Sequence, residues 1–258
     1  MGEAPDFPAA FGLQGHHALI TGGGSGLGLA IAGCFVAAGA RVTLSGTQRG
    51  KLEAACTALG PQAKAMPFDM RDTDGVEAFA ADVERQHGGV SILVNNAGTT
   101  VKKPVDDMTV ADFTDVIDVQ VVGSYALSRA LLPQLTRLPG ASILFTASMS
   151  SFLGIPMVAG YSAAKAAYVG LVRGLATELA PRQVRVNGVA PGWVDTPLFR
   201  EATDRDPARK QKIQSRIPMD RFGDGDDVGW AMTYLASNAA KYVTGHILVV
   251  DGGALHGF

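Results

Sequence analysis

The chain of 258 residues carries 22 lysines and arginines against 24 aspartates and glutamates, a formal charge of −2, and 47% of its residues are hydrophobic. This composition can form a large core, which excludes a disordered chain, and the balanced charge argues against a nucleic-acid-binding surface, which needs a basic face. Glycine is over-represented at 32 residues, above the average usage of roughly 7%.

Cysteine and histidine usage argues against a disulfide framework and a metal site. Cys34 and Cys56 lack the spacing of a zinc site, and the five histidines show no ligand spacing. The N-terminus, with Glu3 and Asp6 where a basic region would be needed, is not typical of a secretory signal. No uncharged stretch reaches transmembrane length. We therefore expect a soluble cytoplasmic protein.

Short apolar runs alternate with longer alanine-rich segments along the chain. Most of the runs lack the alternation of half-exposed strands, which is typical of strands buried on both faces of a parallel sheet. Strands are predicted at residues 17–21, 41–45, 63–69, 92–95, 142–146, 184–190 and 246–250. Helices are predicted at 27–38, 51–59, 73–87, 109–138, 161–180 and 226–236. This order predicts an α/β fold, a single doubly wound Rossmann-type domain spanning residues 1–258, with a seven-stranded parallel sheet and helices on both faces.

Residues 196–218 interrupt the alternation, because they carry mixed charges and few apolar anchors. A solvated helical excursion and a mobile lid over a ligand are both compatible with this pattern.

A glycine-rich loop, TGGGSGLG at residues 21–28, follows the first predicted strand and precedes a helix. Glycine permits a tight turn at Gly22, close approach of the backbone to a pyrophosphate at Gly26, and helix packing at Gly28. The N-terminus of the following helix presents free N–H groups to an anion. Because the loop lies between a strand and a helix, it predicts a dinucleotide site rather than a merely structural turn.

The end of the second predicted strand indicates which dinucleotide binds. Its sequence, SGTQR at 45–49, lacks the acidic residue that would bind the ribose hydroxyls of NAD. Without a carboxylate near Gly46, a 2′-phosphate is not repelled, and Ser45, Thr47 or Arg49 could donate to it. This pattern favours NADP(H) over NAD(H). Asp69, later in the chain, suits either an adenine contact or an ordinary turn.

Three residues have the types and spacing of a catalytic group. Tyr161 and Lys165 are four residues apart, so they share one face of a predicted helix. A neighbouring ammonium stabilises a phenolate, which lets a tyrosine exchange protons nearer neutral pH. Ser148, after a predicted strand, can donate a hydrogen bond to a substrate oxygen.

From Gly12 to Gly253 the sequence resembles the short-chain dehydrogenase/reductase family. The resemblance rests on the loop at 21–28, NNAG at 95–98, YSAAK at 161–165, and Pro191 and Gly192 with Thr196. It implies an NAD(P)-dependent oxidoreductase that interconverts a secondary alcohol and a ketone by hydride transfer.

The resemblance also assigns roles to individual residues. Tyr161 would donate or accept the proton, Lys165 would bind the nicotinamide ribose and lower the tyrosine pKa, and Ser148 would orient the substrate oxygen. The residues that we expect to bind the cofactor are Gly22, Ser25, Gly26, Leu27, Gly28, Gly46, Thr47, Asp69, Met70, Asn95, Ala97, Gly98, Tyr161, Lys165, Pro191, Gly192, Val194 and Thr196. Those expected to line the substrate pocket are Thr99, Thr100, Met149, Ser150, Phe152, Leu153, Met157, Trp193, Leu198 and Phe199.

One position departs from the family pattern. Where the family has an asparagine as its fourth catalytic residue, this chain has Gln120. The family residue helps to hold a water that relays protons to the lysine, so the longer side chain leaves the geometry of that relay open.

The motifs SMSS at 148–151, RFGD at 221–224 and GHILVVDGG at 245–253 resemble the gluconate 5-dehydrogenase-like, sugar-acid and polyol branch. Lys102 and Lys103 either bind a substrate carboxylate there or form a solvated loop pair. Reduction of a 3-oxoacyl group or a bulky hydrophobic ketone is the alternative, and a catalytically weak cofactor-binding sensor or partner protein is the alternative of another class. The family resemblance further implies a homotetramer.

Overall fold

Seven parallel strands form one sheet in the computed structural model, which describes residues 6–197, 199–200 and 206–257. The spatial order is β3-β2-β1-β4-β5-β6-β7. The strands are β1 (His17–Thr21), β2 (Arg41–Ser45), β3 (Ala63–Ala65), β4 (Ile92–Asn95), β5 (Ser142–Thr146), β6 (Arg185–Pro191) and β7 (Ile247–Val250). Every residue of β1, β4 and β5 is buried, which explains their continuous apolar runs. The chain winds outward in both directions from β1 and β4, so ligands are expected in the crevice at the carboxyl ends of these two strands.

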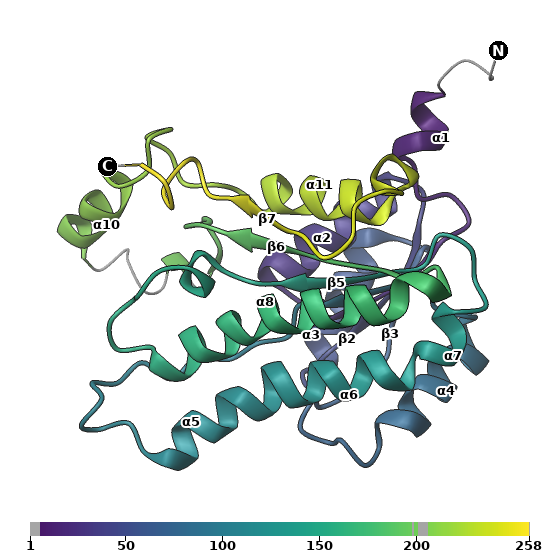
Figure 1. Cartoon of the computed structure of the whole chain (residues 1–258), viewed down its shortest axis with the longest axis horizontal. Helices are drawn as coiled ribbons and strands as arrows, with labels where there is room; N and C mark the ends of the chain where they lie inside the picture. The colour runs from purple at the N-terminus through teal and green to yellow at the C-terminus, as the bar shows by residue number, and fades with distance from the viewer. Residues whose placement is uncertain (1–5, 198, 201–205, 258) are drawn as a thin grey trace.

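Helices cover both faces of the sheet (Figure 1). Against one face pack α2 (Gly26–Ala37), α3 (Arg49–Leu59) and α11 (Gly225–Ala236), with one buried apolar cluster. Against the other pack α4 (Val76–His87), α6 (Gly123–Ala130), α7 (Leu132–Leu135) and α8 (Ala159–Leu179), with a second cluster. The predicted doubly wound Rossmann-type fold is confirmed.

The long helix predicted at 109–138 is interrupted. It is divided into α5 (Val110–Ile117), a π-helical turn (Asp118–Val122), α6 and α7. A capping box between Thr109 and Asp112 begins α5. Hydrophobic periodicity does not reveal the π turn, because the side chains on either side keep a helical spacing. The turn contains Gln120, which is fully buried.

Other boundaries also differ from the prediction. The edge strand predicted at 63–69 ends at Ala65, and Pro67 beyond it cannot donate to the sheet. The helix predicted from residue 73 begins at Val76, after Asp72 accepts a bond from the Gly75 amide. A short helix, α1 (Phe7–Phe11), was not predicted.

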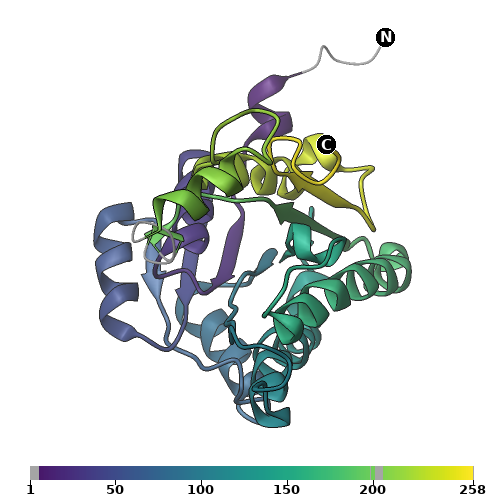
Figure 2. The ribbon, with the colours of Figure 1, turned by 90° about the vertical axis from the view of Figure 1, so that its left-hand side faces the viewer.

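The excursion at 196–218 contains a further helix, α10 (Pro207–Gln214), which Asp206 caps. Figure 2 shows α10 on the side toward the viewer, and Figure 1 shows it beyond the end of α11. At the base of the excursion, Val194 pairs with Gly223 in an isolated bridge. Residues 198 and 201–205 of the predicted lid lie outside the described part of the chain. Within the described ranges, no helix is both long and apolar enough to cross a membrane.

Candidate active site

A cavity of about 700 Å³ opens at the carboxyl ends of the central strands. All the catalytic and cofactor-binding residues expected from the sequence line it, except Asn95 and Gln120. Those that do are Gly22, Ser25, Gly26, Leu27, Gly28, Gly46, Thr47, Asp69, Met70, Ala97, Gly98, Ser148, Tyr161, Lys165, Pro191, Gly192, Val194 and Thr196. The fold therefore brings residues from 22 to 196 to a single cavity.

The glycine-rich loop has the shape of a phosphate cradle. Gly26 has φ of +54°, and a Cβ there would project into open space. A Cβ on Gly28 would clash with the Gly22 carbonyl oxygen at 2.2 Å. Ser25, Gly26, Leu27 and Gly28 line the cavity. The Ser25 side chain forms no capping bond, so it does not occupy the N–H groups of the first turn of α2. These features fit a diphosphate at the positive end of α2.

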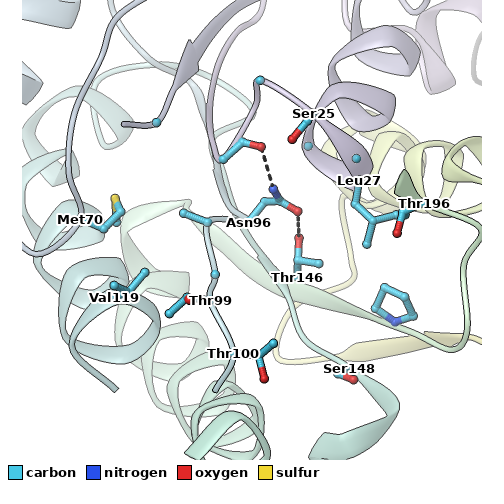
Figure 3. Close-up of a pocket in the computed structure, with 18 of the residues that line it drawn as sticks. Ser25, Leu27, Met70, Asn96, Thr99, Thr100, Val119, Thr146, Ser148 and Thr196 are labelled. Atoms are coloured by element: carbon cyan, nitrogen blue, oxygen red, sulfur yellow. Dashed lines mark hydrogen bonds between the residues drawn. The ribbon is translucent and has the colours of Figure 1, made fainter. Parts of the chain in front are cut away.

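Asn96 joins the glycine-rich loop to the strand that precedes Ser148. Its Nδ2 donates to the Thr21 carbonyl oxygen at 3.0 Å, and its Oδ1 accepts from Thr146 Oγ1 at 3.2 Å. Figure 3 shows this side chain between the loop and Thr146. From the sequence we expected the neighbouring Asn95 in the cofactor site and did not expect Asn96 there. Strand alternation was the available signal, because adjacent side chains point to opposite sides.

Asn95 lies away from the cavity. It is fully buried at the end of β4, and its Nδ2 donates to Ser128 Oγ on α6 at 3.0 Å. Its position is that of a structural residue between the sheet and α6.

The end of the cavity next to Gly46 is lined by Thr47, Gln48 and Lys51. Lys51 is exposed and forms no ion pair with the described residues, whereas Arg71, also in the lining, is bound to Asp69 and Asp115. Neither Ser45 nor Arg49 lines the cavity. Ser45 is buried, and Arg49 faces Glu53 at 3.7 Å. No carboxylate lies within residues 45–49.

Ser148 and Tyr161 approach each other from two elements. Ser148 follows β5 and caps a 3-10 turn (Met149–Ser151), where its Oγ accepts from the Ser150 amide at 3.2 Å. Tyr161 lies in the first turn of α8. Burial raises the pKa of the Tyr161 phenol, and its hydrogen bond with the Ser148 side chain opposes that rise.

Lys165 lies one turn after Tyr161 in α8 and is only 4% exposed. Its Nζ donates to the Thr146 carbonyl oxygen at 2.7 Å and lies 5.5 Å from the centre of the Tyr161 ring. Burial lowers the pKa of this lysine to about 7. Ser148, Tyr161 and Lys165 thus meet at one wall of the cavity, as a proton-exchanging group beside an ammonium and a hydroxyl.

Gln120 lies outside the cavity lining, with its side chain against Gly98 and Thr99. Its Nε2 donates to the Thr99 carbonyl oxygen at 2.8 Å, and its Oε1 is buried without a partner in the described residues. Gln120 therefore supports the cavity wall from outside through Thr99, which itself lines the cavity.

The substrate end is less complete than expected. Thr99, Thr100, Trp193 and Phe199 line the cavity. Met149, Ser150, Phe152, Leu153 and Met157 are absent from its described lining, and Leu198 lies outside the described residues. Lys102 and Lys103, which the sequence suggested as a pair that binds a substrate carboxylate, are also absent from the described cavity lining. Lys103 Nζ binds Asp112 at 2.8 Å, and Lys102 is exposed away from the cavity.

Comparison with known proteins agrees with this geometry. The family model described as enoyl-(acyl carrier protein) reductase matches residues 22–255. The chain is 38% identical to nodulation protein G of Rhizobium meliloti over 94% of its own length and 98% of the relative's. It is 38% identical to 2-dehydro-3-deoxy-D-gluconate 5-dehydrogenase of Pseudoalteromonas atlantica, with coverage of 94% and 97%. The 3-oxoacyl-[acyl-carrier-protein] reductase of Thermotoga maritima is 33% identical, with coverage of 93% and 98%.

A solved structure from Beutenbergia cavernae, assigned as an NAD(P)-dependent gluconate 5-dehydrogenase, is also similar. It has a TM-score of 0.88 and 36% identity, covers 95% of this chain and 99% of its own, and holds NADP at low occupancy. The family match and these full-length similarities agree with the sheet order and the cavity. The chain therefore belongs to the short-chain dehydrogenase/reductase family of NAD(P)-dependent oxidoreductases acting on hydroxyl and keto groups.

Proposed function

We propose that the protein interconverts a secondary alcohol and a ketone, with Tyr161 as the acid and base. The observation that carries this proposal is the meeting of Ser148, Tyr161 and Lys165 at one wall of the cavity whose other end is the glycine-rich loop. A proton donor beside a dinucleotide cradle has the arrangement that carbonyl reduction requires.

The roles follow from the contacts of each residue. A bound nicotinamide supplies or accepts the hydride at the substrate carbon. Tyr161 donates its phenolic proton to the substrate oxygen in reduction and takes a proton from the hydroxyl in oxidation. Ser148, already in contact with Tyr161, holds the same oxygen, and the Lys165 ammonium stabilises the phenolate.

The cofactor that this site favours is NADP(H). The cradle at Gly22, Gly26 and α2 suits the diphosphate shared by both dinucleotides. The absence of a carboxylate in residues 45–49 and the unpaired ammonium of Lys51 in the described lining favour a 2′-phosphate. The Beutenbergia structure with NADP supports the same choice.

The substrate that we propose is a sugar acid or a polyol, and the names of the relatives support the sugar acid. The second candidate is a 3-oxoacyl group or a bulky hydrophobic ketone. Two observations favour it. Trp193 and Phe199 line the substrate end of the cavity, and Lys102 and Lys103 are absent from the described lining.

The experiment that tests the function is turnover followed at 340 nm. Gluconate, 2-dehydro-3-deoxygluconate, simple polyols and 3-oxoacyl thioesters are offered with NADP(H) and NAD(H). Tyr161→Phe removes only the hydroxyl, so we expect kcat to fall by at least about 100-fold while the Kd of NADPH changes by less than about twofold.

Tyr125→Phe is the matched control, because Tyr125 is 48% exposed on α6 and lies outside the described cavity lining. Its turnover should equal that of the wild type. Full turnover by Tyr161→Phe contradicts the assigned role. A wild-type protein that binds NADPH but turns over none of these compounds is instead a cofactor-binding sensor or partner protein.

We further propose that the protein is a cytoplasmic homotetramer and that the described part of the excursion, residues 196–197, 199–200 and 206–218, acts as a lid over the cavity. Exposed apolar side chains on α5 and α6 (Val110, Tyr125) and on α11 (Trp230) support assembly through these helices. Sedimentation equilibrium decides the oligomeric state, since a monomer at micromolar concentration would contradict it.

A further inference from the structure

The ammonium of Lys165 is buried without a carboxylate partner. Its only hydrogen bond in the described residues goes to the Thr146 carbonyl oxygen, and no residue there forms an ion pair with it. An unpaired buried charge is costly, so a group that lies against the ammonium helps to decide how readily the side chain stays charged.

The ring of Tyr168 lies under this ammonium. Tyr168 follows Lys165 by three residues in α8, so the two side chains share one face of the helix. Lys165 Nζ lies 4.7 Å from the centre of the Tyr168 ring, which is closer than its 5.5 Å from the Tyr161 ring. A cation within about 6 Å of an aromatic ring centre is attracted to the ring face, most strongly where water is excluded. Tyr168 is fully buried.

Contacts on two sides fix the Tyr168 ring in this position. Its hydroxyl donates to the main-chain oxygen of Gln120 at 2.9 Å and pairs with Ser124 Oγ at 3.1 Å. The ring packs on Phe145 of β5, with centroids 5.0 Å apart. Gln120 lies in the π-helical turn, where regular helical bonding is interrupted, and its side chain reaches the cavity wall at Thr99. The turn and the ring therefore position each other.

We propose that Tyr168 is a positioning residue for Lys165, its ring face taking the place of a counter-ion and keeping the buried side chain charged beside Tyr161. The other titratable group that faces Lys165 is Tyr161, on the same helix. From β5 the ammonium meets the main-chain oxygen of Thr146. The significance of this charge for the reaction rests on the proposed function, but the contact itself does not.

Lysine NMR on the protein without ligands tests the proposal, because it reports the Lys165 pKa directly. The protein is labelled with 13C-lysine, and the Lys165 signal is identified by its loss in Lys165→Met. Two variants are compared, Tyr168→Phe and the replacement of Tyr168 by 3,4,5-trifluorophenylalanine. The two rings have nearly the same shape, but fluorine withdraws the negative charge from the ring face. We expect the fluorinated ring to lower the Lys165 pKa by about one unit relative to the phenylalanine variant.

Tyr168→Phe should keep the Lys165 pKa close to that of the wild type and lower the Tm, since it loses only the hydroxyl bonds to Gln120 and Ser124. The same fluorinated residue at the exposed Tyr125 is the matched control and should leave the Lys165 pKa unchanged. Equal Lys165 pKa values in the fluorinated and phenylalanine variants would overturn the proposal. That result would leave the proposed function intact, because the measurement involves neither substrate nor turnover.

Discussion

At the residue scale, Lys51 and Arg49 are two exposed cations in the first turn of one helix, and only Lys51 lines the cavity. Lys51 has no ion-pair partner in the described residues, whereas Arg49 faces Glu53. If a 2′-phosphate binds beside Gly46, Lys51 is the cation without an ion-pair partner in the described lining at that end of the cavity. Arg49, which the sequence suggested as a donor to this phosphate, lies outside the cavity lining and faces Glu53.

Lys51→Gln should therefore weaken NADPH binding by about tenfold, or about 1.4 kcal/mol, while NADH binding changes by less than about twofold. Dissociation constants from cofactor fluorescence give both values, and competition by 2′,5′-ADP against 5′-AMP isolates the phosphate. Arg49→Gln is the matched control and should alter neither affinity. An equal loss for NADPH and NADH in Lys51→Gln, or wild-type affinity for NADH at or above that for NADPH, is incompatible with this assignment.

At the element scale, the packing of α2 against the glycine-rich loop depends on two glycines with different surroundings. A Cβ at Gly28 would lie 2.2 Å from the Gly22 oxygen and 2.6 Å from Asn96 Nδ2, both in the cavity wall. A Cβ at Gly33, on the same helix, would meet only Leu59 at 3.8 Å. Sequence alone treats both as helix glycines.

Gly28→Ala should displace the loop, weaken NADPH binding at least about tenfold and destabilise the protein by about 1–3 kcal/mol, the usual cost of overpacking. Gly33→Ala should instead stabilise it by about 0.5–1 kcal/mol, because alanine favours the helix and no atom obstructs it. Urea unfolding and NADPH titration of the two variants check this contrast. A Gly28→Ala protein with wild-type NADPH affinity would show that the loop tolerates the extra methyl group.

At the scale of the whole molecule, stability should depend on pH through histidines buried near the amino-terminal ends of the strands. His17 Nε2 bonds with Thr43 Oγ1 at 2.8 Å, and Thr43 Oγ1 in turn bonds with His87 Nδ1 at 3.0 Å. Burial lowers the pKa of His17 from 6.5 to about 4, and burial also lowers the pKa of His16 and His87. Charging any of these rings works against the folded state.

Because the folded His17 pKa is the lower one, the unfolded chain binds more protons between pH 6.5 and 4. The contribution of neutral His17 to the free energy of unfolding is therefore complete above pH 6.5 and is lost as the pH falls toward 4. At pH 5 the loss from His17 alone is about 2 kcal/mol. Urea unfolding at pH 7.5 and 5 measures this loss. His17→Gln should remove much of the difference, whereas the same change at the exposed His246 should preserve it. A pH dependence unchanged in His17→Gln would exclude His17 as its source.

The order of apolar runs and helical segments was enough to predict the fold class, because continuous apolar strands alternating with helices pack well as a parallel sheet covered on both faces. The glycine-rich loop and the group of Ser148, Tyr161 and Lys165 were also recognisable from short spacings in the sequence, and the structure places them in one cavity. In each case the motif lies at the end of a strand or on one face of a helix.

Features that depend on the direction of a side chain or on contacts between distant residues became visible in the three-dimensional structure. It placed Asn96 rather than Asn95 at the cavity, because adjacent strand residues face opposite sides. In the structure Lys103 binds Asp112, whereas Lys51 has no ion-pair partner among the described residues. Spacing along the sequence cannot predict these pairings. The structure also revealed the π turn at Gln120 and the Tyr168 hydroxyl that bonds to it across 48 residues of sequence, a contact that exists only after α8 packs against that turn.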